Sequence, residues 1–380
     1  MALGSAAFFC CTFRPETVGK FILLFLFPVA LTAHSQDSTI APQIRVSGFL
    51  DVFYAYDLNR PTGTTRQSFF YNHNRHNEFN LNLGFIKLGL EHTKYRANLA
   101  LHAGTYVVDN YAQEPGMLKN LFEANVGLSL NKKNDLWLDA GIFASHIGFE
   151  SAITSDNWTL TRSILAENSP YYFSGAKVSY TPNEKWLFSA LVLNGWQRIQ
   201  RLDGNSMLSF GSQITYTKKD KIQLNWSTFI GTDSPDTNRK MRYFSNVYGK
   251  FQLNKHLSAI AGFDYGIQQK SKDSTAYATW FSPVLIVRYA WKENWALALR
   301  GEYYEDRTGV IINTFVPGGF RSSSISLNLD YSPINNVLCR IEGRYLYSDE
   351  AILPTRDLPV KNDLFFTAAI NVGFGAWIRK

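Results

Sequence analysis

The sequence predicts an all-β protein, a transmembrane antiparallel up-and-down β-barrel of about sixteen strands with short periplasmic turns and long extracellular loops. Three observations support this fold class. Long segments alternate between apolar and polar residues, short and long connections follow one another in strict succession, and aromatic residues reach 15% of the chain. Such an aromatic content suits both β-structure and the girdles that barrels place at membrane interfaces.

The alternation is clearest in KIQLNWSTFIGTD, residues 221–233. Leu224 and Trp226 fall on one face, while Gln223 and Asn225 fall on the other, because successive strand side chains point to opposite sides. Similar segments of roughly ten to thirteen residues recur from Ile44 to the C-terminus. They match the length that crosses a bilayer and exceed the usual strand of soluble domains. We therefore expect the apolar faces to contact lipid and the polar faces to line a water-filled interior.

The connections favour a barrel over a soluble sandwich. Seven tight turns, such as NKKND at residues 131–135 and WKEN at residues 291–294, interleave with eight larger loops, such as residues 58–77 and 148–170. Short turns at one end and long loops at the other are typical of outer-membrane barrels. Fifteen such connections join sixteen strands and place both chain ends on the periplasmic side.

The N-terminus has the parts of a secretory signal peptide, predicted over residues 1–35. A basic flank precedes the apolar run FILLFLFPVAL, and small residues follow it before a predicted cleavage after Ser35. The run is shorter than the roughly 20 residues of a membrane-spanning helix. We expect residues 36–43 to form a short periplasmic segment and residues 44–380 to form the barrel.

Composition excludes several other classes. The net charge of +7 is not gathered into the basic stripe that a nucleic-acid-binding protein needs. Three cysteines, two of them adjacent at Cys10 and Cys11, build neither a disulfide framework nor a zinc site. No phosphate loop, dinucleotide fingerprint or nucleophile elbow is present. The sequence thus predicts no enzyme, no cofactor, no metal and no nucleic-acid partner.

Charged residues on the predicted polar faces are candidates for lining a pore. In a barrel of this size the interior is expected to hold water, so these side chains would keep much of their hydration and bias which solutes pass. The candidates are Arg96, His102, Glu123, Asp139, Lys177, Lys250, Asp264, Arg288, Arg300, Glu302, Arg340, Glu342 and Arg344.

Five of these candidates lie close together on neighbouring predicted strands. They are Arg300, Glu302, Arg340, Glu342 and Arg344. They could form a charged wall that sets selectivity, or they could neutralise one another across adjacent strands with no net effect. The residues alone leave both interpretations open.

The longest loop, residues 148–170, follows the predicted fifth strand. In general porins a long loop at this position folds into the lumen and narrows it. Glu150, Asp156, Arg162 and Glu167 would then lie at the constriction. The alternatives are an ordinary surface loop or a short helical lid.

Two weaker patterns point to other chemistry. His73, His76 and Glu78 are metal-binding types within six residues, but their spacing lacks a strong zinc pattern. Ser145 and His146, with His102, are the candidates for a lipid hydrolase on the barrel. Because Ser145 and His146 are adjacent, a strand would turn them to opposite faces, which weakens them as a catalytic pair.

Four phrases of the sequence resemble a known family. SGFLDVFYAYDLNRP at 47–61, DAGIFASHIGFES at 139–151, PYYFSGAKVSYTPNEKW at 170–186 and ALVLNGWQ at 190–197 are similar to the β-barrel porin-2 family called OmpL-like. The likeness covers nearly the whole mature chain and implies an outer-membrane channel without catalytic residues. One departure is the C-terminus AWIRK, where many barrels end in an aromatic residue.

These observations together predict an outer-membrane porin, a passive diffusion channel for small hydrophilic solutes or ions. A barrel enzyme and a surface-binding, adhesin-type barrel are the alternatives. The expected partners are outer-membrane lipid, the barrel-assembly machinery and the solutes themselves, and a homotrimer is left open.

Overall fold

The computed structural model describes residues 41–378, which form one closed antiparallel barrel of sixteen strands. The strands are β1 (Gln43–Asp57), β2 (Phe79–Glu91), β3 (Tyr95–Ala103), β4 (Leu121–Ser129), β5 (Leu136–Ala144), β6 (Tyr172–Asn183), β7 (Trp186–Leu193), β8 (Ser209–Lys218), β9 (Ile222–Gly231), β10 (Arg242–Gln252), β11 (Leu257–Gln269), β12 (Tyr277–Lys292), β13 (Trp295–Asp306), β14 (Phe320–Tyr331), β15 (Val337–Ser348) and β16 (Asn362–Ile378). The predicted fold class and strand number are confirmed. The predicted signal peptide, residues 1–35, lies outside the described residues.

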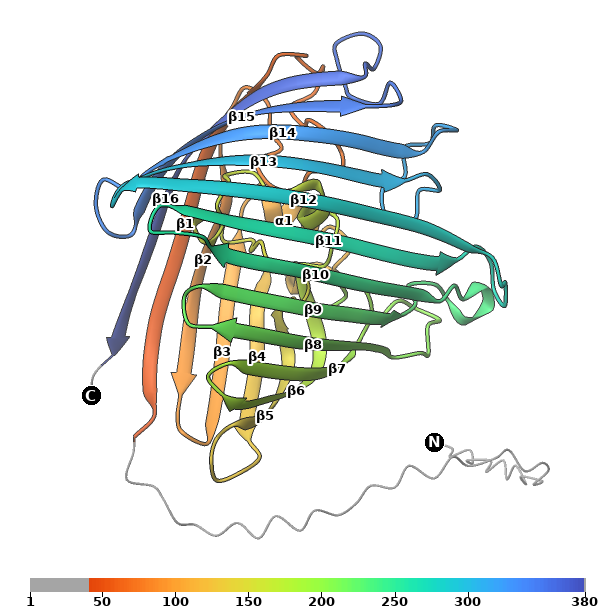
Figure 1. Ribbon diagram of the computed structural model, residues 1–380. Helices are drawn as coiled ribbons and strands as arrows, with labels where there is room; N and C mark the ends of the chain where they lie inside the picture. The colour runs from red at the N-terminus through yellow and green to blue at the C-terminus, as the bar shows by residue number, and fades with distance from the viewer. Residues whose placement is uncertain (1–40, 379–380) are drawn as a thin grey trace, which may run out of the picture. The chain divides into compact units, whose positions relative to one another are not determined.

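Each strand pairs with its neighbours in sequence, and β1 pairs with β16 to close the barrel. Tight turns gather at one end and long loops at the other, as Figure 1 shows with turns to the left and bottom and loops to the right and top. We call these the turn end and the loop end. This is the up-and-down topology that the alternation of short and long connections predicts.

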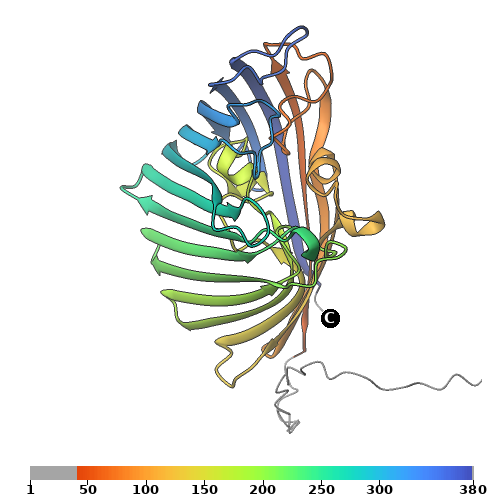
Figure 2. The ribbon, with the colours of Figure 1, turned by 90° about the vertical axis from the view of Figure 1, so that its right-hand side faces the viewer.

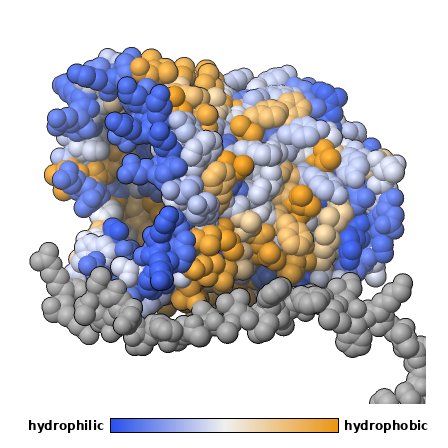
Figure 3. Space-filling model, turned by 60° about the horizontal axis from the view of Figure 1, so that its bottom comes forward, coloured by the Kyte–Doolittle hydropathy of each residue, from blue (hydrophilic) through white to orange (hydrophobic). Residues whose placement is uncertain are grey.

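The outer wall of the barrel is apolar. On β9, Leu224 is 43% exposed and Trp226 is 49% exposed, whereas Asn225 between them is 3% exposed. Figure 3 shows hydrophobic residues spread over the wall between hydrophilic residues on either side. An apolar band of this kind suits contact with lipid, so the outward direction predicted for the apolar face of β9 is confirmed.

Aromatic side chains flank this band near both ends of the strands. At the turn end, Trp295 and Tyr331 stack with ring centroids 4.4 Å apart. At the loop end, the rings of Tyr54 and Phe79 lie 4.9 Å apart. Paired aromatics at two levels are typical of the interfacial girdles of membrane barrels.

Within residues 41–378, helical structure is confined to the long loops. The elements are α1 (Thr105–Asn110), η1 (Gly116–Asn120), η2 (Thr154–Asp156), α2 (Ile164–Glu167) and η3 (Asp236–Asn238). Within the described part of the chain, no helix has the length and apolar character needed to cross a membrane.

The loop-end half of the interior contains a hydrophobic core. Its buried members include Phe70 and Ile164 from loops, and Phe229 and Trp280 from strands. A barrel of sixteen strands is too wide for its own side chains to fill, so loop residues supply the missing volume. The expectation of a water-filled interior is therefore wrong for this half of the barrel.

The direction of each wall residue has a testable consequence. Leu285 is 52% exposed on the outer face near the middle of β12, so Leu285→Arg should destabilise the inserted barrel by about 2–4 kcal/mol. Gln223→Arg on the inner face of β9 should insert normally, because its side chain faces a hollow. Unfolding in lipid vesicles compares the two variants, and equal losses would contradict the assigned register.

Candidate pore constriction

One long connection, residues 145–171, lies inside the barrel, and we call it the lumenal loop. In Figures 1 and 2 its yellow-green segment lies within the ring of strands. The hydroxyl of Thr154 donates to the Asp51 carboxylate of β1 at 3.0 Å, and the backbone N–H of Gly148 donates to Asn246 of β10 at 3.1 Å. Because these strands are far apart around the barrel, the loop crosses the interior instead of covering the surface.

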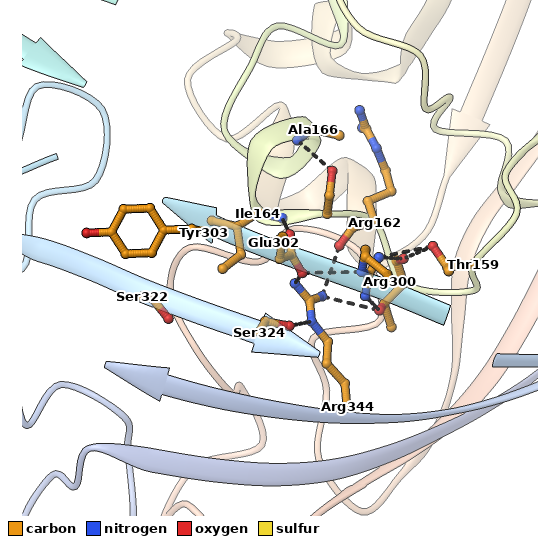
Figure 4. A network of polar contacts seen from close by, with 12 residues as sticks. Thr159, Arg162, Ile164, Ala166, Arg300, Glu302, Tyr303, Ser322, Ser324 and Arg344 are labelled. Carbon is orange, nitrogen blue, oxygen red and sulfur yellow. Dashed lines mark hydrogen bonds and ion pairs between the residues drawn. The ribbon is translucent and has the colours of Figure 1, made fainter. Parts of the chain in front are cut away.

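Four charged side chains of β13 and β15 form a buried cluster on the inner wall. A guanidinium nitrogen of Arg300 lies 2.7 Å from Glu342 Oε1 and another lies 3.2 Å from Glu302 Oε1. Arg344 completes the cluster with an ion pair of 2.6 Å to Glu302. Figure 4 shows Arg300, Glu302 and Arg344 of this cluster beside residues of the lumenal loop. All four side chains are at most 1% exposed, so two cations and two carboxylates balance each other away from water.

The same cluster holds the lumenal loop through backbone groups. The Arg300 guanidinium donates to the carbonyl of Thr161 at 2.5 Å, and that of Arg344 donates to the carbonyl of Arg162 at 2.9 Å. In return, the Thr161 N–H donates to Glu342 at 2.6 Å. Loop carbonyls thus meet cations and a loop amide meets a carboxylate. The contacts favour mutual neutralisation over a free charged wall, and they add an anchoring role that the sequence did not indicate.

Arg340 repeats this arrangement nearer the turn end. It forms an ion pair with Asp330 of β14 at 2.8 Å. Its other nitrogens donate to the carbonyls of Thr154 at 2.6 Å and Asn157 at 3.0 Å. Charge-assisted hydrogen bonds of this kind are stronger than neutral ones, so the loop is fixed at several points along its length.

An apolar contact fixes the other side of the lumenal loop. Phe149, Leu165 and Ala166 pack against inner-wall side chains of β10–β13, among them Tyr248 and Val284. The ring centroids of Phe149 and Tyr248 are 5.6 Å apart. Burial of apolar surface on one side and ion pairing on the other together hold the loop in one position.

The first long loop, residues 58–78, also enters the interior, which the sequence analysis did not predict. Asp51 accepts a hydrogen bond from His73 of this loop at 2.9 Å, on the same carboxylate that holds Thr154. Glu167 of the lumenal loop accepts from the Tyr71 N–H at 2.8 Å. The adjacent Phe69 and Phe70, both buried, were the available signal, because two phenylalanines are costly in an exposed loop.

The four residues proposed for the constriction do not share one environment. Glu150, Arg162 and Glu167 are buried, while Asp156 is exposed. The Glu150 carboxylate accepts from the Ser163 N–H at 3.1 Å, and the Arg162 guanidinium lies 3.6 Å from the centroid of the Tyr171 ring. Burial raises the pKa of Glu167, although Arg162 and the Tyr71 N–H oppose the shift. Glu150, Arg162 and Glu167 therefore contact other residues of the inward loops, and only Asp156 faces water.

All thirteen candidates for pore lining lie on the inner face of the wall, but they differ in burial. Eight are buried, against the expectation that they keep their hydration; the lumenal loop covers Arg300, Arg340 and Arg344, whereas Arg96 of the wall covers Asp139. These are His102, Asp139, Asp264, Arg300, Glu302, Arg340, Glu342 and Arg344. Five keep partial contact with solvent, namely Arg96, Glu123, Lys177, Lys250 and Arg288.

Space remains at the turn end of the interior. Four hollows of about 710, 730, 560 and 290 Å³ are lined by inner-wall and turn residues there. Trp158 of the lumenal loop lines the hollows of about 710 and 290 Å³. Ser155 of the same loop lines the hollows of about 710 and 730 Å³. We call all four the turn-end hollows. The hollows of about 710 and 730 Å³ adjoin each other and share Ser155, whereas strand and turn residues alone line the hollow of about 560 Å³.

The residues considered for catalysis do not pair. The Ser145 hydroxyl accepts from the Ile147 N–H at 3.0 Å, while His146 Nε2 donates to the carbonyl of Thr228 at 2.9 Å. His102 Nε2 likewise donates to a backbone carbonyl, that of Lys119, at 2.9 Å. With Nε2 engaged as a donor, neither ring presents that nitrogen as a base to a serine.

The histidines considered for metal binding have separate partners. His73 Nε2 donates to Asp51, and His76 Nδ1 accepts from the Asp57 N–H at 3.0 Å. Within residues 41–378, no group of three or more His, Cys, Asp or Glu side chains is placed to hold a metal ion.

Comparison with known proteins agrees with this geometry. The sequence model of the family described as "Putative beta-barrel porin-2, OmpL-like" matches residues 43–374. The chain belongs to this porin family. No curated protein matches the chain in sequence.

Solved structures of outer-membrane channels share the porin's fold. The anion-selective porin from Comamonas acidovorans is 8% identical, with a TM-score of 0.60 over 88% of this chain and 100% of that one. The outer membrane channel DcaP of Acinetobacter baumannii is 10% identical, with a TM-score of 0.58 over 89% and 99%. The trimer form of OmpT from Vibrio cholerae is 7% identical, with a TM-score of 0.57 over 88% and 100%. Membership of the porin family and the closed barrel with its apolar outer band make the porin a β-barrel of the bacterial outer membrane, and the short turns of such barrels lie in the periplasm.

Proposed function

We propose that this porin is a narrow passive channel for small hydrophilic solutes or ions, with the lumenal loop as its constriction. The observation that carries the proposal is the loop itself, held across a closed sixteen-stranded barrel by Arg300, Arg340 and Arg344. A loop held against the wall by polar and apolar contacts would narrow the lumen. It leaves hollows open at the turn end. Solutes would pass by diffusion, without a catalytic residue, cofactor or metal.

The arrangement in the membrane belongs to the same proposal. The apolar band would contact outer-membrane lipid, and the barrel-assembly machinery would insert the chain. A homotrimer is supported by the likeness to the trimer form of OmpT from Vibrio cholerae. The likeness to an anion-selective porin from Comamonas acidovorans supports a channel that distinguishes ions by charge.

Single-channel recording of the refolded porin in a planar bilayer tests the proposal. Stable steps of small conductance are expected, because the loops leave only part of the lumen open. Folding is verified beforehand by the heat-dependent gel mobility of intact barrels. A folded barrel that never conducts would remove the channel and favour the alternatives, a lipid hydrolase or a surface-binding barrel.

A further inference from the structure

The wall of the turn-end hollows carries more positive than negative charge. The four hollows are lined by seven carboxylates and eight cationic side chains, and two further cations, Lys87 and Arg340, pair with lining carboxylates. Cations therefore exceed carboxylates by three. We propose that Lys177, Lys250 and Arg288 carry this excess and make the channel select small anions over cations. The inference rests on the proposed channel function.

Ion pairing identifies which cations are free to act on a solute. Three carboxylates line these hollows from the middle part of a strand, and each of them has a cation beside it; Glu91, the last residue of β2, is exposed at the edge of its hollow. The pairs are Glu123 with Lys87 at 2.6 Å, Asp139 with Arg96 at 2.6 Å and Asp330 with Arg340 at 2.8 Å. Because a close pair has little net field, these six groups attract neither sign of ion strongly.

Lys177, Lys250 and Arg288 have no such partner. In the part of the chain that the structure describes, none of the three has a carboxylate oxygen within 4.0 Å. Lys177 lies 5.0 Å from the Phe143 ring centroid, and Lys250 Nζ donates to the carbonyl of Phe149 at 3.3 Å. All three are half-buried, so each charge is only partly screened by water.

The rim of the hollows does not cancel the excess. Its exposed acids are Glu91, Asp220 and Glu293, to which the lumenal loop adds Asp156, and its lysines are Lys219, Lys221, Lys255 and Lys292. The two sets are equal in number. The three unpaired cations of the wall thus set the sign of the field in the hollows.

The three cations line three different hollows. Lys177 of β6 lines the hollow of about 560 Å³, Lys250 of β10 lines that of about 290 Å³, and Arg288 of β12 lines that of about 710 Å³. A solute that enters any of these three hollows meets one unpaired cation. Charged residues in narrow, partly dehydrated pores favour ions of opposite sign. Chloride and small carboxylates are the class of solute that this wall fits.

The test is the reversal potential of single channels under a gradient of potassium chloride. The wild-type porin should show a chloride-to-potassium permeability ratio above one. The triple variant Lys177→Gln, Lys250→Gln and Arg288→Gln should lower this ratio several-fold while keeping the folded gel mobility and stable conductance steps. Each single variant should cause part of the shift.

A control variant removes the same charge elsewhere. Lys132→Gln, Lys133→Gln and Lys185→Gln change three lysines of the outer turns that line none of the turn-end hollows. These changes should leave the permeability ratio unaltered. A cation preference in the wild-type porin, or an equal shift in the control, would overturn the inference while the channel itself stands. Absence of steps from the folded wild-type barrel would instead overturn the proposed function.

Discussion

Arg300→Met is expected to destabilise the porin by about 3–5 kcal/mol, since it removes one partner of a buried ion pair. The change leaves Glu342 without the cation that lies 2.7 Å away, and it frees the carbonyl of Thr161 from its hydrogen bond. A buried carboxylate without compensation costs far more than an exposed one. Denaturant unfolding of the porin in lipid vesicles measures the loss. In bilayers, the loosened loop should also make the conductance steps noisier.

Two further variants distinguish the loss of stability caused by breaking the buried network from any general effect of removing an arginine. Arg307→Met breaks an ion pair with Glu305 in which the Arg307 side chain is 63% exposed, and it should leave unfolding unchanged within error. The double variant Arg300→Met with Glu342→Gln should be more stable than Arg300→Met alone, because it no longer buries an uncompensated carboxylate. Additive losses in the double variant would contradict the proposed coupling.

The strands could be predicted from the sequence because each of them meets two different solvents. Leu224 faces lipid and Asn225 faces the interior, so the physical difference between the two sides appears as a period of two in the residues. The connections carried equally direct information, since membrane barrels use short turns at one end. The number of strands and their order followed from these two regularities.

The contents of the lumen could not be predicted in the same way. The lumenal loop is held largely through its backbone, for example at the carbonyls of Thr161 and Arg162, and a backbone group has the same chemistry in every residue. Arg300 and Arg344 were recognised as a cluster, but nothing in their spacing indicated that a loop would occupy their remaining donors. Phe69 and Phe70 indicate that residues 58–78 need a buried site, but they do not indicate that the loop reaches Asp51, a partner distant in the sequence.

The position of the lumenal loop also determines how much current the channel carries. Ala144 and Tyr172 are direct partners across β5 and β6, so the strands can be joined by a short connection without the loop. Replacing residues 149–168 by Gly-Ser-Gly should keep the barrel closed and raise single-channel conductance several-fold, because sixteen strands enclose an aqueous channel once their lumen is cleared. Stability should fall, since Tyr248 and Val284 would lose the apolar contacts that the loop provides.

A shortened loop that lies outside the constriction gives the matching control. Leu353 and Val360 exchange backbone hydrogen bonds of 3.0 and 2.9 Å, so a two-residue turn can replace the intervening residues 354–359. Four of these six residues, 356–359, are exposed, and removal of the six should leave the conductance unchanged. If the variant without residues 149–168 conducts no better than this control, then the buried contacts of Arg300, Arg340 and Arg344 stabilise the barrel without limiting its current. The constriction would have to lie among the residues of the first loop that hydrogen-bond to Asp51 and Glu167.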